Sequence, residues 1–430
     1  MRSIPFLGAA LAAALGCAMP AAATAAGTSA DSLPAGQAVA LFYADRAEPL
    51  WLRSPEAIRS LLVELRAGPV DGFADGPDLA LAIERALGDA EAGIPGAARE
   101  AERLMSNAFV LHAQALHWPG SAQMIFADPS LSPRVPSPSE LLDAAAQAPD
   151  LAGHVRQTFA VNPIYAGLRK AAAADMRFLG TPSRAVRASL DRARLLPASG
   201  RWVMVDIASQ QLMMMEDGEV VDRMRVVVGK PDMKTPLMAG TLRQVTFNPY
   251  WNVPVDLAAK NIAPNVRRHG VGWFKGRGYE VLSGWEADAA VIDPATVDWK
   301  AVEEGRAEAR VRQRPGPNNM MGEMKFQFPN ELGIYLHDTP ARQRFDEAER
   351  AFSAGCVRLE DAARLGRWLL GREPVPTSGR PEYEVPLGQG VPVFLTYLTV
   401  WPNADGTLAY APDIYGLDGA VEEQRVAVAY

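Results

Sequence analysis

Two hydrophobic patterns divide the chain. From about residue 36 to 196, apolar residues recur at the spacing of one helix face, as in Ile58, Leu61, Leu62 and Leu65. From Arg201 onward, apolar and polar residues alternate instead, which is the spacing of half-buried strands. The pattern therefore predicts an α+β protein in which a helical N-terminal part precedes a β-rich C-terminal part.

Short-range signals add detail to both parts. Ser137 followed by Glu140 is typical of a capping box at a helix start, and Asp217-Gly218 between two alternating runs predicts a hairpin. In the β-rich part, only residues 341–351 and 359–371 have a clear helical pattern. We interpret His112 and His117, which lie on or beside one predicted helix, as structural or surface residues.

One stretch of the β-rich part breaks the alternation. Residues 256–318 are polar and irregular, and the stretch is too long for a simple loop. We expect an inserted subdomain or lid over the sheet. The expected division is a helical domain at 27–196, a β-rich domain at 197–416 and a tail at 417–430.

The N-terminus has the features of an export signal. Arg2 precedes an apolar run, and Ala23-Thr24-Ala25 matches the small-residue cleavage pattern. The run is short for a membrane anchor, so we predict a cleaved signal peptide over residues 1–26. Lipidation at Cys17 is disfavoured because Ala14 stands where lipoprotein signals usually have an aliphatic residue.

Composition narrows the class of partner. The chain has 430 residues, 48% hydrophobic and 22% charged, with a net charge of −7 and no long basic run. This describes a folded protein with no sign of nucleic-acid binding. None of the five histidines has a spacing to cysteine that suggests a zinc site. Once a signal peptide is removed, Cys356 is the one remaining cysteine, and an unpaired thiol in an exported protein calls for an explanation.

Cys356 lies in "SAGCVR", and His337 precedes it at the end of an apolar, strand-like run. The sequence predicts a helix between them and another directly after Cys356, whose N-terminus would lower the pKa of the thiol. An imidazole beside the thiol would act as its base. The residues thus indicate a nucleophile and base, with a buried inert cysteine as the alternative.

The neighbours of Cys356 have more than one reading. Backbone N–H groups of Gly355 and Cys356 are suited to stabilise an oxyanion. Arg358 fits equally well in an ion pair or in contact with substrate. Asp338 and Ser353 are suited either to orient the histidine or to shape their turns, and we favour the structural role for both.

The segments "LHDTP", "RAFSAGCVRLED", "GPNNMMGEMKFQFPN" and "FNPYWNVP" resemble the YkuD-type L,D-transpeptidases, in particular their large periplasmic Gram-negative branch. The resemblance covers roughly residues 200–416 and reaches the helical part through "FYADRAEPLWL" and "NPIYAGLRKAA". It implies that Cys356 is the acylated nucleophile and His337 its base, and that Ser353, Gly355 and Arg358 complete the site. It also implies that 256–318 caps the substrate groove.

The resemblance further implies a reaction in the periplasm without metal or organic cofactor. Cys356 would attack a tetrapeptide stem of peptidoglycan, release D-Ala and pass the acyl group to the diamino-acid amine of a second stem, forming a 3→3 cross-link. Carbapenems would be inhibitors. Attack by water would instead give an L,D-carboxypeptidase, and a wall hydrolase or isopeptidase would use the same pair. A non-catalytic wall-binding protein is the third alternative, and protein partners cannot be read from the sequence.

Aromatic residues are candidates for the wall of the groove. Tyr335 lies two positions before His337, so both are expected on one side of the strand. Tyr250, Trp251 and Trp273 lie in turn-rich or inserted segments. A packing role is favoured for each of these three taken singly, because large aromatic side chains dominate core energetics.

Two features depart from the family pattern. Ala354 stands where many members have a histidine before the Gly-Cys pair, so no second imidazole assists here. Relatives also often carry a small peptidoglycan-binding module between scaffold and catalytic domain. Only "DMRFLGTPSRAVRASLDRARLLP" spans that interval, which is too short for the module.

Overall fold

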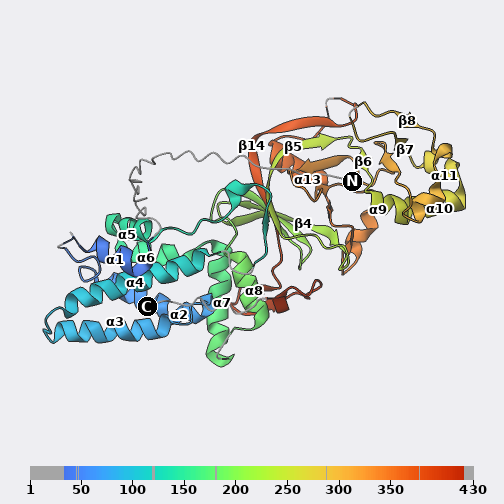
Figure 1. Ribbon diagram of the computed structural model, residues 1–430. Helices are drawn as coiled ribbons and strands as arrows, with labels where there is room; N and C mark the ends of the chain where they lie inside the picture. The colour runs from blue at the N-terminus through green and yellow to red at the C-terminus, as the bar shows by residue number, and fades with distance from the viewer. Residues whose placement is uncertain are drawn as a thin grey trace, which may run out of the picture.

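The computed structural model describes residues 33–44, 46, 48–118, 122–179, 182–286, 288–376 and 378–420. The predicted signal peptide, with Cys17, and the end of the predicted tail lie outside these residues. A helical lobe and a β-rich lobe lie next to each other in an elongated molecule (Figure 1). The α+β class expected from the hydrophobic pattern is confirmed.

The helical lobe begins near the start of the described chain and ends just before the first long strand. Its helices are α1 (Ala35–Phe42), α2 (Pro55–Asp71), α3 (Gly76–Glu91), α4 (Ala97–His117), α5 (Pro138–Gln147), α6 (Leu151–Ala160), α7 (Pro163–Leu179) and α8 (Arg184–Ala193).

Helix α2 shows how local sequence sets these elements. Ser54 caps its start by accepting a hydrogen bond from the Ala57 N–H, and Gly72 ends it in the left-handed conformation with φ of 88°. Leu61 and Leu65 are fully buried on its inner face. The capping box predicted for Ser137 and Glu140 is present at the start of α5.

The β-rich lobe is built on one large sheet. Its strands are β1 (Ile125–Phe126), β2 (Arg201–Asp206), β3 (Gln211–Glu216), β4 (Glu219–Gly229), β5 (Met238–Phe247), β10 (Met324–Gln327), β11 (Leu336–His337), β12 (Ala351–Ser353), β13 (Val357–Leu359) and β14 (Tyr383–Thr396). They follow the order β5-β10-β11-β13-β4-β3-β2-β14, and β14 pairs with β5 again. The sheet therefore closes on itself as a barrel.

Alternating side chains give this sheet two apolar faces. Val203 and Val205 of β2 join the barrel core, with Leu336 and Val357 of the site strands. The intervening Trp202 and Met204 belong instead to the core of the helical lobe. One sheet face thus packs against the helices, which fixes the two lobes together through a shared core.

The predicted hairpin is confirmed. β3 and β4 pair antiparallel, with Glu216 opposite Glu219 and Asp217-Gly218 between them. Both turn residues have positive φ, 48° for Asp217 and 88° for Gly218, as a type I′ turn requires. The turn chemistry read from the sequence therefore determines the register of this strand pair.

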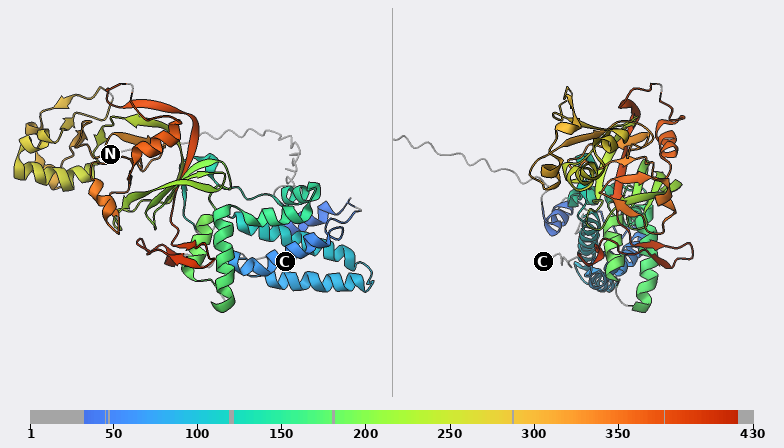
Figure 2. Two further views of the ribbon diagram at one scale, coloured as in Figure 1. Left: turned by 180° about the vertical axis from the view of Figure 1, so that it is seen from behind. Right: turned by 90° about the vertical axis from the view of Figure 1, so that its right-hand side faces the viewer.

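The inserted stretch folds around a core of its own. Its elements are β6 (Trp251–Asn252), α9 (Val255–Leu257), α10 (Ala263–His269), α11 (Val271–Gly276), β7 (Tyr279–Leu282), β8 (Val291–Ile292), α12 (Trp299–Glu303) and β9 (Arg310–Gln313). The strands form a separate sheet in the order β6-β9-β7-β8. Seen from behind, this insert lies at the end of the molecule opposite the helical lobe (Figure 2).

The helix predicted over 341–351 is wrong. The segment has only a short 3₁₀ turn, Arg342–Asp346, and then enters β12, which pairs parallel with β4. The edge of β4 offers backbone partners, since the Val228 N–H donates to the Arg350 carbonyl and the Lys230 N–H to the Ser353 carbonyl. Tertiary pairing overrides the local helical pattern here.

The second helix predicted in this part is confirmed in a shorter form. α13 (Ala362–Leu370) starts after Asp361, whose carboxylate caps it by accepting from the Arg364 N–H. After β14, β15 (Val400–Pro402) and β16 (Leu408–Tyr410) form a small antiparallel hairpin, and a 3₁₀ turn follows at Asp418–Ala420. No helix in the described part of the chain combines the length and apolar character needed to cross a membrane.

Candidate active site

The candidate residues gather on the outer face of the barrel wall formed by β10, β11 and β13. His337 lies opposite Arg358 of the parallel strand β13 and opposite Lys325 of the antiparallel strand β10. Their neighbours Leu336 and Val357 point into the barrel core. Because side chains alternate along a strand, His337, Arg358 and Lys325 share the other face.

The imidazole of His337 is buried and held by the backbone. Its Nδ1 lies 2.5 Å from the carbonyl oxygen of Asp338. A carbonyl only accepts, so Nδ1 carries the proton and Nε2 keeps its lone pair. Burial and the positive charges of Arg358 and Lys325 outweigh that hydrogen bond and lower the pKa of His337 to about 3. The ring is therefore neutral near pH 7 and able to accept a proton at Nε2.

The Asp338 side chain has a structural role, as the sequence favours. Its carboxylate accepts the Glu323 N–H at 2.9 Å and pairs with Arg342 at 2.5 Å. The carboxylate therefore shapes the turn after β11. The part of Asp338 that orients the histidine is its main-chain carbonyl, which any residue at this position would supply.

Cys356 lies in a tight turn between β12 and β13. The Ser353 hydroxyl donates to the Cys356 carbonyl at 2.6 Å and accepts the Gly355 N–H at 3.1 Å. Gly355 has φ of 114°, where a side chain is strained. Ser353 and Gly355 thus set the shape of the turn that carries the thiol, so Ser353 has the structural role that the sequence favours.

The environment of the thiol differs from the one expected. Cys356 is followed by strand β13, so the predicted helix N-terminus at this position is wrong. Burial raises the pKa of Cys356, although a Tyr335 backbone hydrogen bond and the charge of Arg358 oppose the effect. The thiol donates to the Gly333 carbonyl at 3.6 Å. No hydrogen bond joins it to His337 among the described residues.

Arg358 supplies an unpaired cation beside the thiol. Within the described part of the chain it pairs with no carboxylate, and its buried Nε has no hydrogen-bond partner. Burial lowers the pKa of Arg358, while the neighbouring Cys356 raises it. Of the two roles open from the sequence, the ion pair is thus absent, and the guanidinium remains available to an anionic group.

Tyr335 joins this cluster through charged neighbours. Burial, Cys356 and Glu382 raise the pKa of its phenol, and Lys325 Nζ lies 5.4 Å from its ring centroid. Lys325 also lies 3.5 Å from Glu382, whose carboxylate accepts the Tyr250 N–H at 2.7 Å. Glu382 thus links the site strands to the start of the insert. Its sequence context, "RPEYEVP", has no signal that predicts this position.

The other predicted aromatic residues lie in or beside the insert. Trp251 and Trp273 each lie near Tyr279, with ring centroids 6.5 and 6.0 Å apart. Both pack against the core of the insert. Tyr250 is covered by the Arg312 guanidinium at 4.1 Å. Each of these three rings has a packing partner and remains partly exposed, and only Tyr250 is tied to the cluster, through its main chain.

Among the described residues, no group of three or more His, Cys, Asp or Glu side chains is arranged to hold a metal ion. The chemistry available at this site is that of a thiol, a neutral imidazole and two cationic side chains.

Family comparisons place this site in context. Residues 200–389 match the YkuD family model, described as the L,D-transpeptidase catalytic domain, and residues 37–171 match the model of the Scaffold domain. The chain carries an L,D-transpeptidase catalytic domain behind a Scaffold domain. The insert and the Cys356 turn lie within the region matched by the catalytic-domain model. The closed sheet does too, except for the end of β14, which extends to Thr396.

A curated relative agrees with this family. A putative L,D-transpeptidase of Haemophilus influenzae is 33% identical over 234 residues, which are 53% of this chain and 46% of that protein. The match therefore spans about half the length of the relative.

Two solved structures align with part of this chain at low sequence identity and low TM-score. The Ldtfm–avibactam carbamoyl enzyme is 11% identical, with a TM-score of 0.23, over 47% of this chain and 50% of that one. An L,D-transpeptidase from Mycobacterium smegmatis is 14% identical, with a TM-score of 0.23, over 46% and 59%.

Proposed function

We propose that this protein is a periplasmic L,D-transpeptidase that forms 3→3 cross-links in peptidoglycan. The observation that carries the proposal is the juxtaposition of strands β11 and β13, which brings His337 level with Arg358, two residues from Cys356. A nucleophile, a neutral base and a cation thus share one patch of the barrel wall. Tyr335, Tyr250, Trp251 and Trp273 are proposed to contact the substrate.

The proposed first half-reaction is acylation. Sγ of Cys356 attacks the carbonyl carbon between the diamino acid and the terminal D-Ala of a tetrapeptide stem, and the thiol proton passes to Nε2 of His337. The tetrahedral intermediate collapses as His337 protonates the D-Ala nitrogen, which leaves a thioester. Because the resting thiol and imidazole are both neutral, the proton transfer accompanies the attack, and Arg358 stabilises the negative charge that develops on sulfur.

The second half-reaction transfers the acyl group. The side-chain amine of a second stem attacks the thioester, His337 takes the amine proton and returns it to the departing thiolate, and an amide bond replaces the C–S bond. Water as acceptor would release a tripeptide instead. We propose that the insert excludes water from the site, which would favour the amine over water and so transfer over the L,D-carboxypeptidase alternative.

The proposal includes the organisation of the full chain. Residues 1–26 are a signal peptide, 27–196 the scaffold, 197–416 the catalytic domain with its capping insert at about 256–318, and 417–430 a tail. N-terminal sequencing of protein recovered from the periplasm tests the cleavage, because an intact Met1 would contradict it.

Intact-mass spectrometry tests the reaction. The mature protein is incubated with a disaccharide-tetrapeptide or with a carbapenem, beside a Cys356→Ser control. An adduct on Cys356 with released D-Ala and dimeric muropeptide is the expected result. An adduct followed only by tripeptide identifies the carboxypeptidase. Absence of any adduct, or cross-linking retained by Cys356→Ser, overturns the mechanism.

A further inference from the structure

A buried threonine, Thr235, contacts the backbone of the turn that carries Cys356. Thr235 lies between β4 and β5, and its side chain is almost fully buried. Its hydroxyl donates to the Gly355 carbonyl at 2.7 Å and accepts the Gly229 N–H at 2.9 Å. The one proton of this hydroxyl is therefore directed to the peptide group that immediately precedes Cys356.

The C-terminal segment holds this threonine in place. The Tyr415 hydroxyl accepts the Thr235 N–H at 3.2 Å and donates to the Gly229 carbonyl at 2.5 Å. Lys234 Nζ donates to the Tyr415 carbonyl at 2.7 Å. The Tyr415 ring stacks on Tyr397 with centroids 5.5 Å apart. Thr235 is thus fixed on both its backbone and its side chain.

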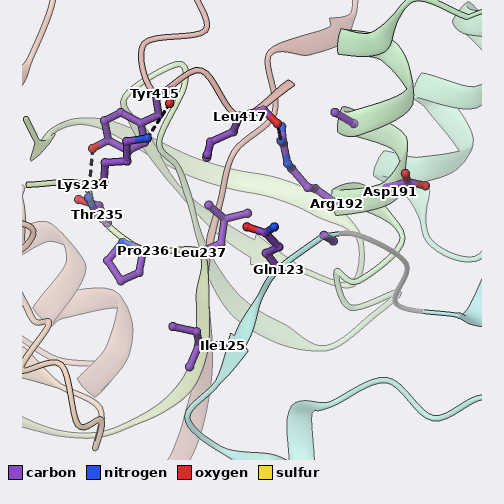
Figure 3. Close-up of a pocket in the computed structure, with 12 residues that line it drawn as sticks. Gln123, Ile125, Asp191, Arg192, Lys234, Thr235, Pro236, Leu237, Tyr415 and Leu417 are labelled. Atoms are coloured by element: carbon purple, nitrogen blue, oxygen red, sulfur yellow. Dashed lines mark hydrogen bonds between the residues drawn. The ribbon is translucent and has the colours of Figure 1, made fainter. Parts of the chain in front are cut away.

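Figure 3 shows the hydrogen bonds of Tyr415 with Lys234 and Thr235 at one end of a cavity. The cavity has a volume of about 210 Å³ and separates this group from Asp191 and Arg192 of helix α8. Shortly after Tyr415, the Leu417 carbonyl and the Asp418 carboxylate accept hydrogen bonds from Arg192. The C-terminal segment that holds Thr235 is therefore attached to the helical lobe.

The bond to Gly355 determines where the next amide points. A trans peptide is planar, with its C=O and N–H directed to opposite sides. With the Gly355 carbonyl held toward Thr235, the Cys356 N–H is directed away from it. Ser353 already occupies the Gly355 N–H, whereas the Cys356 N–H has no partner among the described residues. The Cys356 amide is thus free to donate to another group.

We infer that Thr235 is a positioning residue for the oxyanion hole: its hydroxyl fixes the Gly355–Cys356 peptide so that the Cys356 N–H meets the oxyanion formed on the substrate. This rests on the proposed acyl transfer. Removing the hydroxyl frees the peptide to rotate, and losing one aligned donor typically slows such reactions on the order of 10²–10³-fold.

The test compares Thr235→Val, which keeps the shape and removes the hydroxyl, with Thr235→Ser, which keeps the hydroxyl. Acylation of the full mature chain by a disaccharide-tetrapeptide is followed by intact mass at saturating substrate. Thr235→Val is expected to acylate about 100-fold more slowly, and Thr235→Ser within about threefold of the parent.

Alkylation by iodoacetamide separates positioning from a general loss of structure. Displacement at a saturated carbon forms no oxyanion, so the alkylation rate of Cys356 is expected to be the same in all three proteins. Equal slowing of alkylation and acylation in Thr235→Val would overturn the inference, as would acylation at the parental rate.

A second variant covers the case in which Thr235→Val does not fold. Tyr415→Phe removes only the hydroxyl that holds Thr235, and it is expected to slow acylation about 10-fold with alkylation unchanged. An unchanged acylation rate in Tyr415→Phe would then count against the inference. If the parent itself is not acylated, the proposed function fails and this inference fails with it, whereas an active parent beside unaffected variants overturns the inference alone.

Discussion

The protein buries two histidines in opposite electrostatic surroundings. His112, in the helical lobe, has Nε2 3.0 Å from the Asp71 carboxylate, and its ring stacks on Phe73 at 4.7 Å. His337, in the catalytic domain, has a backbone carbonyl as its partner and two cations nearby. The first histidine faces a carboxylate through Nε2, although its buried Nδ1 has no hydrogen-bond partner among the described residues, whereas the second faces two cations and no carboxylate.

The Asp71 carboxylate that contacts His112 has several further hydrogen-bond partners. Asp71 accepts hydrogen bonds from the Tyr165 hydroxyl at 2.6 Å and from two nitrogens of Arg169 at 2.7 Å. Burial alone raises the pKa of Asp71, but the hydrogen bond from His112 and the charge of Arg169 outweigh it and lower the pKa to about 2. A cluster whose hydrogen-bonding groups face one another stabilises the fold and leaves little for chemistry.

The contrast teaches how to read a buried polar residue. Arg358 and His337 are both surrounded by protein, yet neither faces a carboxylate within the described residues. Unpaired charge at a buried site costs stability, so its presence marks a site that reserves its interactions for something else. By the same reasoning, the sequence prediction of a structural role for His112 agrees with its contacts.

Exchanging the two histidines for glutamine is expected to separate activity from stability. His337→Gln should slow acylation by about 10²–10⁴-fold, because a general base is lost, with little change in unfolding. His112→Gln should lower the free energy of unfolding by about 2 kcal/mol, because buried partners lose a hydrogen bond. Intact-mass kinetics and urea unfolding measure the two effects. The same loss of activity per folded molecule in both variants would refute the contrast.

Asp71→Asn should weaken the helical lobe strongly. Removing one partner of a buried ion pair leaves Arg169 without its main counter-charge, at a cost of about 3–5 kcal/mol. Asp71 also has a lowered pKa, so its stabilisation is present above its ordinary range and lost as the pH falls toward 2. Urea unfolding at pH 7 and pH 3 should show a smaller acid loss in the variant than in the parent.

Burial and the nearby cations are expected to set the pH dependence of acylation through the pKa of His337. With its pKa lowered to about 3, His337 stays neutral from pH 7 to pH 5, so acylation should not lose its base in that range. Arg358→Met removes the cation with the larger effect on His337, and Lys325→Met removes the one with the smaller effect. The pKa of His337 should therefore rise in both variants, and more in Arg358→Met. The ratio of acylation rates at pH 7 and pH 5 should increase in the same order.

The lowered pKa of His337 also predicts that the protein loses stability as the pH falls. An unfolded histidine takes up a proton near pH 6.5, whereas folded His337 does not until about pH 3. Stability therefore falls as the pH drops between these values, by up to about 1.4 kcal/mol per pH unit from this group. His337→Gln should remove this contribution in urea unfolding at pH 6 and pH 4. An unchanged slope would contradict the burial of a neutral ring.

The smallest effect is expected at Ala354. Its side chain is exposed on the turn before Gly355. Ala354→His should therefore change the acylation rate by less than about threefold, because a side chain in solvent contributes little to a preorganised site. A larger gain would show that this chain lacks an assisting imidazole, and Ala354→Gln serves as the size-matched control.

Local sequence predicted much of this molecule because the information is local. Ser137 and Glu140 form their capping box within one helical turn, and Asp217-Gly218 supplies the positive φ values of its own hairpin. The alternating pattern identified the strands in the same way. These features depend on neighbouring residues, and no distant contact is needed to specify them.

The sequence names candidate residues for the site, and its prediction of their local surroundings was wrong. "SAGCVR" and the preceding histidine point to Cys356 and His337. The segment before Cys356 pairs with β4, however, and the segment after it pairs with both β11 and β4. The helix expected before Cys356 is therefore absent, and the helix expected after it starts only beyond Asp361, so burial raises the pKa of the thiol where a helix end would have lowered it.

The sequence alone determined the α+β order, the turn chemistry and the identity of the thiol and imidazole, since each depends on periodicity or on a short run of residues. Tertiary structure decided the rest. Only the pairing of β11 with β10 and β13 brings Lys325 and Arg358 to either side of His337, and only the packing of the C-terminal segment sets Tyr415 against Thr235. Electrostatic shifts and hydrogen bonds act through space, so their partners come from segments whose separation along the chain hides them.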